Sequence, residues 1–130
     1  MGMLDSFFGN KKIDKSDKGS FIKWIPLTTI EQLEVVKNQS ENKPVAIFKH
    51  STRCGISSMV IKRFENNFDE ELKDLKVYYL DLLSYRDISN EISAQFQVTH
   101  QSPQLLVIKK GAVVVHASHY DISKVDLKKI

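Results

Sequence analysis

The chain has 130 residues, the usual length of a single domain, and its 42% hydrophobic and 27% charged residues are typical of a soluble globular protein. Its net charge of +3 comes from scattered lysines rather than from one basic stripe, and no apolar run approaches the roughly 18 residues that span a membrane. Together with the lack of a signal-peptide pattern, these features predict a cytoplasmic protein that binds neither nucleic acid nor membrane.

The first part of the chain divides into a polar arm and a strand followed by a helix. Residues 1–20 are rich in lysine, aspartate and glycine, and we expect them to form a flexible arm ahead of a domain over residues 21–130. The short apolar run 21–25 predicts a strand. A helix is predicted over 28–39, with one of the two threonines at its start as the N-cap.

The middle of the chain alternates apolar strands with helices. Residues 45–48 are a continuous apolar run, which suits a buried central strand. Large apolar residues recur at helical spacing over 56–68, so we predict a helix there. A second buried strand is predicted over 77–80 and a further helix over 87–96.

The last part of the chain predicts a hairpin and a closing helix. A strand over 105–108 leads into a tight turn at 109–111 and a returning strand over 112–116. Residues 122–130 are predicted to form the closing helix. This order of elements predicts an α/β fold with parallel crossovers, in which a central mixed β-sheet is flanked by helices.

Cys54 is the only cysteine, which excludes an internal disulfide and a cysteine-rich metal site, so we assign no metal ligands. A lone cysteine is either a small buried hydrophobe or a reactive thiol. The position of Cys54 between a buried strand and a helix favours the reactive thiol. The free N–H groups of the first helical turn and the helix dipole both stabilise negative charge on the sulfur. Cys54 is therefore the predicted catalytic nucleophile.

Neighbouring residues are candidates for stabilising the thiolate. Arg53 is an adjacent cation, and Ser57, one helical turn further on, has a hydroxyl and a backbone N–H that can donate to sulfur. Gly55 has no side chain and leaves room for a disulfide partner. His50 is either a thiolate partner and proton relay or a structural histidine at the end of a strand.

The arrangement of a strand, Cys-x-x-Ser at a helix start and a proline before a hairpin resembles the thioredoxin fold. The segment 98–111 is similar to the cis-proline strand and hairpin of thioredoxins. The resemblance implies that the Ser102–Pro103 peptide bond is cis and that the backbone beside it docks an extended substrate.

Other segments resemble the YtxJ, or monothiol bacilliredoxin, family more closely. They are residues 24–27, residues 48–52 and the Cys-x-Ile-Ser string that begins at Cys54, and the resemblance extends over about residues 21–120. Gly55 departs from the proline that commonly follows the cysteine in that family.

The family resemblance implies a monothiol thiol–disulfide oxidoreductase that removes bacillithiol, or a similar small thiol, from protein mixed disulfides. Bacillithiol is then a co-substrate, with no bound cofactor, and the partners are S-thiolated client proteins. The implied site comprises the nucleophile Cys54, the thiolate-stabilising residues Arg53, Ser57 and His50, and the substrate-binding residues Thr52, Gly55, Ser102 and Pro103.

Two alternatives remain at this point. Cys54-Gly55-Ile56-Ser57 is also close to the Cys-Gly-Phe-Ser motif of monothiol glutaredoxins, many of which bind an iron–sulfur cluster with glutathione, although Gln101-Ser102-Pro103 replaces their Thr-Val-Pro. The other alternative is a non-catalytic adaptor that keeps the thioredoxin fold and presents its groove to a partner.

Overall fold

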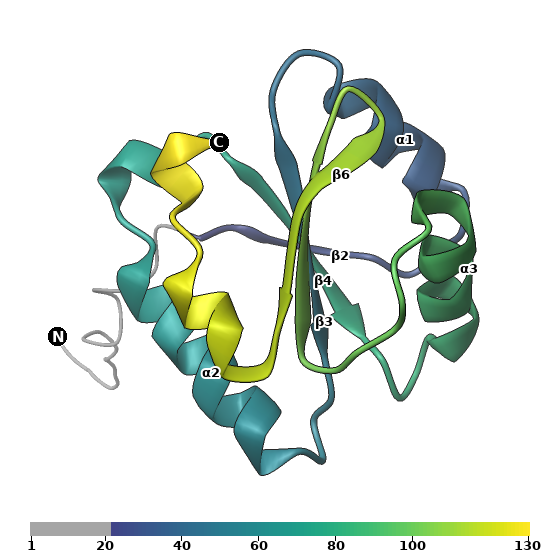
Figure 1. Cartoon of the computed structure of the whole chain (residues 1–130). Coiled ribbons are helices and arrows are strands. Elements are labelled where there is room, and N and C mark those ends of the chain that lie inside the picture. The colour runs from purple at the N-terminus through teal and green to yellow at the C-terminus, as the bar shows by residue number, and fades with distance from the viewer. Residues whose placement is uncertain (1–21) are drawn as a thin grey trace, which may run out of the picture.

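The structure, a computed structural model, describes residues 22–130 and contains one five-stranded sheet with helices on both faces (Figure 1). The arm expected over residues 1–20 lies outside the described residues. In chain order the elements are β2 (Trp24–Pro26), α1 (Gln32–Gln39), β3 (Val45–His50), α2 (Gly55–Asn67), η2 (Glu70–Leu72), β4 (Lys76–Asp81), α3 (Arg86–Phe96), β5 (Gln104–Lys109), β6 (Ala112–Ser118), η3 (His119–Lys124) and η4 (Leu127–Lys129).

The strand order is β2-β4-β3-β5-β6, with β3 in the centre. Strands β2, β4 and β3 are parallel, whereas β5 runs antiparallel to β3 and forms a hairpin with β6. The hairpin turn uses Lys110 and Gly111, which both have positive φ, as a two-residue loop between twisted strands requires. The predicted α/β class, the parallel crossovers and the closing hairpin are confirmed.

Each face of the sheet is covered by its own layer (Figure 1). One apolar cluster includes Ile47 of β3 with residues of α1 and α3, and a second includes Phe48 of β3 with residues of α2 and Ile122. All six residues of β3 are buried, and neighbours along the strand point to opposite faces. By this alternation, His50 lies on the face of α2, and Lys49 lies on the face of α1 and α3.

An aromatic group holds α2 against the sheet. The ring of Trp24 lies 6.0 Å from the ring of Phe48, 6.0 Å from that of Phe64 and 5.7 Å from that of Tyr79. The Trp24 indole N–H donates to the Glu65 carboxylate at 2.8 Å, so the polar edge of this ring is also bonded to α2. These contacts fix the helix that begins beside Cys54.

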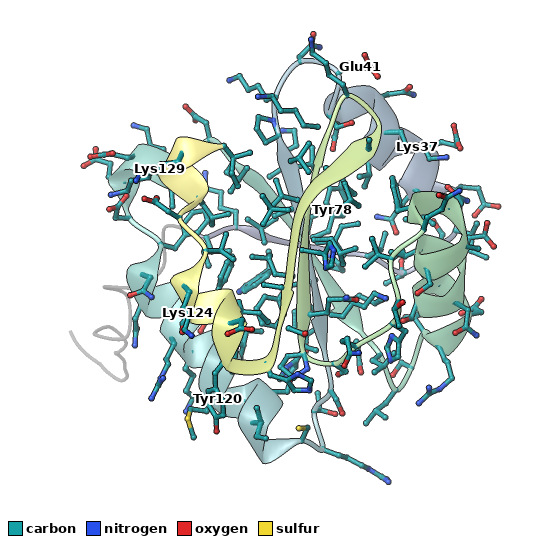
Figure 2. All side chains as sticks on the ribbon, in the orientation of Figure 1. Lys37, Glu41, Tyr78, Tyr120, Lys124 and Lys129 are labelled. Carbon is teal, nitrogen blue, oxygen red and sulfur yellow. The ribbon has the colours of Figure 1, made fainter. Side chains whose placement is uncertain are left out.

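On the opposite face, β4 is tied to α1. The Tyr78 hydroxyl donates to Gln39 Oε1 at 2.8 Å. Figure 2 shows Tyr78 on this side of the sheet, and Lys124 and Lys129 on the C-terminal segment at the other side. No helix within residues 22–130 is both long and apolar enough to cross a membrane.

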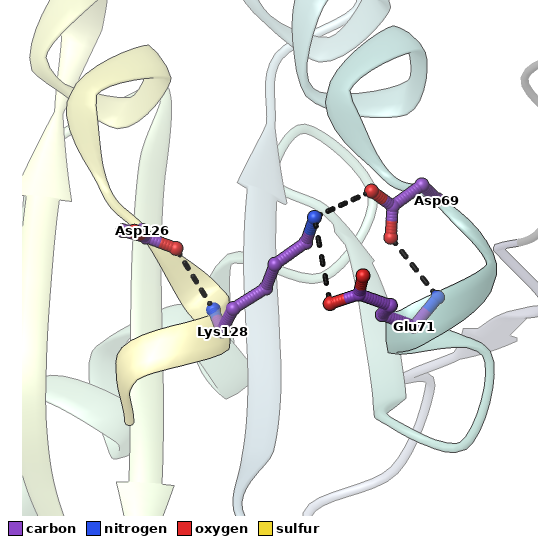
Figure 3. A network of polar contacts seen from close by, with 4 residues as sticks. All are labelled: Asp69, Glu71, Asp126 and Lys128. Carbon is purple, nitrogen blue, oxygen red and sulfur yellow. Dashed lines mark hydrogen bonds and ion pairs between the residues drawn. The ribbon is translucent and has the colours of Figure 1, made fainter.

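The predicted closing helix over 122–130 is wrong, because the chain there forms two short 3₁₀ helices. Val125 between them has extended backbone angles, φ −75° and ψ 128°. The Asp126 carboxylate then accepts from the Lys128 N–H at 3.1 Å and caps η4. Lys128 Nζ also contacts Asp69 at 2.6 Å and Glu71 at 3.7 Å, which fastens the chain end to η2 (Figure 3).

The start of the first predicted helix is also corrected. α1 begins at Gln32 with Glu31 as its N-cap, not at the threonines. The Gln32 side-chain carbonyl accepts from the N–H groups of Thr28 and Thr29, at 2.7 and 3.0 Å. Thr29 Oγ1 in turn accepts from the Gln32 N–H at 3.3 Å, so Thr29 makes the reciprocal bonds of a capping box from the turn that precedes the helix.

Candidate active site

Cys54 is the N-cap of α2, immediately after the loop that leaves β3. Its backbone is extended, with φ −101° and ψ 121°, its N–H donates to the Ser51 carbonyl at 3.1 Å, and its carbonyl accepts from the Ser58 N–H at 3.1 Å. The residue is partly exposed. The thiol therefore lies at the positive end of a 13-residue helix, where first-turn N–H groups have no partner within the helix.

Ser57, in the first turn of α2, is fully buried and connects three parts of the site. Its Oγ accepts from the Ser51 N–H at 3.1 Å and lies 2.7 Å from His50 Nδ1. The end of β3, the active-site loop and the start of α2 are thus joined through one hydroxyl. Within residues 22–130, the Ser57 hydroxyl contacts these two groups and not the Cys54 sulfur.

Whether His50 Nδ1 carries a proton decides to which group the Ser57 hydroxyl can donate. A hydroxyl has one proton and two acceptor positions, and the Ser51 N–H occupies one of these positions. If Nδ1 of His50 carries a proton, Ser57 accepts it and its own proton is free for another group. If Nδ1 is bare, Ser57 donates to it. Burial lowers the pKa of His50, and the nearby carboxylates of Asp81 and Glu65 partly oppose this effect.

The other residues beside the cysteine lie on the surface. Thr52, Arg53 and Gly55 are exposed, and a Cβ added to Gly55 would have no heavy atom within 4 Å beyond its chain neighbours. Ile56 and Met59 follow on α2 with 39% and 44% of their surface exposed. A disulfide partner can therefore approach Cys54 from this side.

The Ser102–Pro103 peptide bond is cis, as predicted. Pro103 is buried, and its carbonyl accepts from the His119 N–H at 3.0 Å. Gln104, the next residue, pairs with Lys49 of β3 in the antiparallel ladder. β5 begins beside the C-terminal end of β3. The cis-proline loop and the Cys54 loop therefore lie at the same end of the strands, which we call the active-site edge of the sheet.

Lys49 is a polar residue of this edge that the sequence reasoning missed. It is fully buried in the central strand, and burial lowers its pKa to about 8. Its Nζ lies 3.4 Å from His100 Nδ1, which is also 3.1 Å from Ser89 Oγ on α3. The only sequence signal was a lysine that directly extends the apolar run of a predicted strand.

A metal centre has no support in the described part of the chain. Within residues 22–130, no three histidine, cysteine, aspartate or glutamate side chains gather closely enough to bind a metal ion.

Solved structures share this fold. A candidate oxidoreductase with a thioredoxin fold is 35% identical over 76% of this chain and 85% of its own, with a TM-score of 0.65. The thioredoxin of Malassezia sympodialis (23% identity, TM-score 0.56) is covered over 81% of its length by 76% of this chain. For the thioredoxin of Trypanosoma brucei brucei (17% identity, TM-score 0.62), the match covers 82% of this chain and 88% of that thioredoxin. The fold and the single thiol define a thioredoxin-fold redox protein.

The family model described as monothiol bacilliredoxin BrxC matches residues 25–127. The chain belongs to the monothiol bacilliredoxin family, and its general role is thiol redox chemistry.

Proposed function

We propose that the protein removes bacillithiol, or a similar small thiol, from protein mixed disulfides by exchange at Cys54. The observation that carries the proposal is the position of the only thiol as the N-cap of α2, partly exposed, in a chain of this family. The sulfur is both accessible and placed where a helix terminus stabilises negative charge.

The reaction has two balanced exchange steps. The Cys54 thiolate attacks the small-thiol sulfur of the mixed disulfide, forming a new S–S bond while the client thiolate leaves and takes a proton from water. A second small thiol, as its thiolate, then attacks the small-thiol sulfur held on Cys54. The Cys54 thiolate is released, and the small thiol leaves as its symmetrical disulfide. This second thiol is the reductant.

The remaining site residues have supporting roles in the proposal. Arg53 and the N–H groups of the first turn of α2 stabilise the thiolate. His50 and Ser57 fix the loop that carries the sulfur, through their 2.7 Å contact. Thr52, Gly55, Ser102 and Pro103 form the surface on which an extended segment of an S-thiolated client lies. The proposed site of action is the cytoplasm, where such clients form.

A client protein with one bacillithiol-modified cysteine provides the test. Addition of catalytic amounts of the reduced protein, with free bacillithiol in excess, should restore the unmodified client mass faster than bacillithiol alone. Cys54→Ser should abolish this acceleration, because the chain has no other thiol. Ser58→Ala, a change on the same helical turn at a half-buried residue, is the matched control and should retain it. Equal rates with and without the protein would refute the proposal.

A further inference from the structure

Lys49 has a buried ammonium group with no carboxylate beside it. Within residues 22–130 it forms no ion pair, and its lowered pKa is explained by burial alone, without an opposing carboxylate. Removing an ammonium from water is unfavourable unless an opposite charge compensates. A buried lysine next to the end of the central strand therefore points to an anion from outside this part of the chain.

The polar contact of Lys49 is with the His100 ring, whose Nδ1 accepts from the ammonium because an ammonium can only donate. His100 Nδ1 lies 3.4 Å from Lys49 Nζ and 3.1 Å from Ser89 Oγ, in the first turn of α3. The charges of Lys49 and Arg86, the first residue of α3, both lower the pKa of His100, in addition to burial. No carboxylate of the described residues raises the pKa of His100 against them. Asp87 in the same turn is exposed. The N-terminal end of the α3 dipole adds positive potential.

Two buried polar atoms in the adjoining loop and strand have no hydrogen-bond partner among the described residues. They are Gln104 Oε1 and Ser102 Oγ. Gln104 pairs with Lys49 across the β3–β5 ladder, so the two side chains share one face of the sheet. Buried polar atoms are normally bonded, and unpaired ones call for an explanation. Of the two, only the Ser102 hydroxyl can donate to an anion, because Gln104 Oε1 is an acceptor.

Lys49, His100 and Arg86, here called the cationic cluster, lie at the edge of the sheet that carries the thiol. Lys49 immediately precedes His50, whose ring contacts Ser57 in the first turn of α2. Lys49 and His50 point to opposite faces of β3, so a ligand joined to Cys54 has to cross the end of the strand to reach the cluster. His100 is half-buried and Arg86 is exposed, so these two are the accessible groups, and the charges of Arg86 and Lys49 both act on the His100 ring.

We propose that Lys49, His100 and Arg86 form a recognition site for a carboxylate group of the small thiol that Cys54 exchanges. The inference rests on the proposed function for the identity of the ligand, but the site itself needs only an anion. Bacillithiol fits this class because its malyl group is a dicarboxylate, separated from its thiol by a sugar. The site would select carboxylated small thiols over neutral ones.

Binding of malate to the reduced full-length protein tests the site without any thiol chemistry. We expect malate to shift the NMR signal of the His100 ring and neutral malamide not to shift it. Arg86→Gln and Lys49→Met should each weaken malate binding about fivefold or more. Arg63→Gln, which removes an exposed arginine from α2, should not. No malate-dependent shift at His100, or equal binding by Arg86→Gln, would overturn the inference.

Turnover of two mixed disulfides separates this inference from the proposed function. With a bacillithiol-modified client, Arg86→Gln should raise KM severalfold and leave kcat nearly unchanged, and with a mercaptoethanol-modified client it should change neither. An equal effect on both clients would contradict recognition of the carboxylate. Malate binding in a protein that removes neither thiol would support the anion site and refute the proposed function.

Discussion

His50 Nδ1 lies 2.7 Å from Ser57 Oγ, so the last residue of β3 is bonded to the first turn of the helix that begins at Cys54. The contact is buried on both sides and also includes the Ser51 N–H. The serine that replaces the second cysteine of a Cys-x-x-Cys pair is therefore part of the framework that holds the active-site loop in place.

Ser57→Ala should lower the free energy of unfolding by about 1–3 kcal/mol, because it leaves the Ser51 N–H and the His50 ring without their partner in a buried place. Ser58→Ala, at a half-buried neighbour, should change it by less than about 0.5 kcal/mol. Urea unfolding of the two variants measures both values. Equal losses would show that the Ser57 hydroxyl has no structural role.

The stability of the protein should fall as the pH drops below the ordinary range of histidine. Burial lowers the pKa of His50 from 6.5, so the unfolded chain binds a proton at a higher pH than the folded chain. The contribution of neutral His50 to the free energy of unfolding is complete above pH 6.5. It is lost as the pH falls through the pKa of His50 in the folded protein. His100 has a pKa lowered in the same direction and adds to the slope.

Between about pH 7 and pH 5, the free energy of unfolding should therefore decrease less in His50→Gln than in the parent protein. Urea unfolding in this interval provides the comparison. The His100 contribution should persist in this variant. Identical slopes in the two proteins would mean that His50 has the same pKa in the folded and unfolded states.

Lys49→Met should stabilise the fold at pH 7 by about 1–4 kcal/mol, because an apolar chain of similar length replaces a buried ammonium that has no carboxylate partner. The pKa of Lys49 is lowered to about 8 in the folded protein from 10.5. The parent protein should therefore gain stability relative to the variant as the pH rises from 8 to 10.5. A variant less stable than its parent at pH 7 would show that the charge is compensated.

Gly55→Pro should raise the free energy of unfolding by about 0.4–1 kcal/mol. Proline suits the first position of a helix, and the extended backbone of Cys54 is the conformation that a residue before proline prefers. Gly55→Ala is the control, because it restricts the unfolded chain, has room for its Cβ and retains the backbone N–H of residue 55. If the proline variant is less stable than the alanine variant by more than about 1 kcal/mol, this N–H has a structural partner.

Most of the fold was predictable because the strands are strongly apolar. The run from Val45 and the Lys110-Gly111 turn indicated a buried central strand and a hairpin, and both are confirmed. The C-terminal segment was not predictable in this way. Its apolar residues fit a helix, but the side-chain cap at Asp126 and the tertiary contact of Lys128 with Asp69 favour two short 3₁₀ helices.

The position of Cys54 at a helix start could also be predicted, since a buried strand and an amphipathic helix flank it. The partners of the polar residues could not. Sequence spacing placed Ser57 one turn from the thiol, but only the folded structure shows its contact with His50, seven residues earlier. The contact between Lys49 and His100 joins residues 51 apart in the chain, so local sequence gave no indication of it.

The central claim, that Cys54 exchanges a small thiol without a resolving cysteine, is tested most directly by intact mass. The reduced protein is incubated with oxidised bacillithiol, freed of reagent and weighed over time. We predict the addition of one bacillithiol per chain on Cys54, none on Cys54→Ser, and an adduct that persists until free bacillithiol is added. Failure to form the adduct, or its loss without any added thiol, would contradict this account.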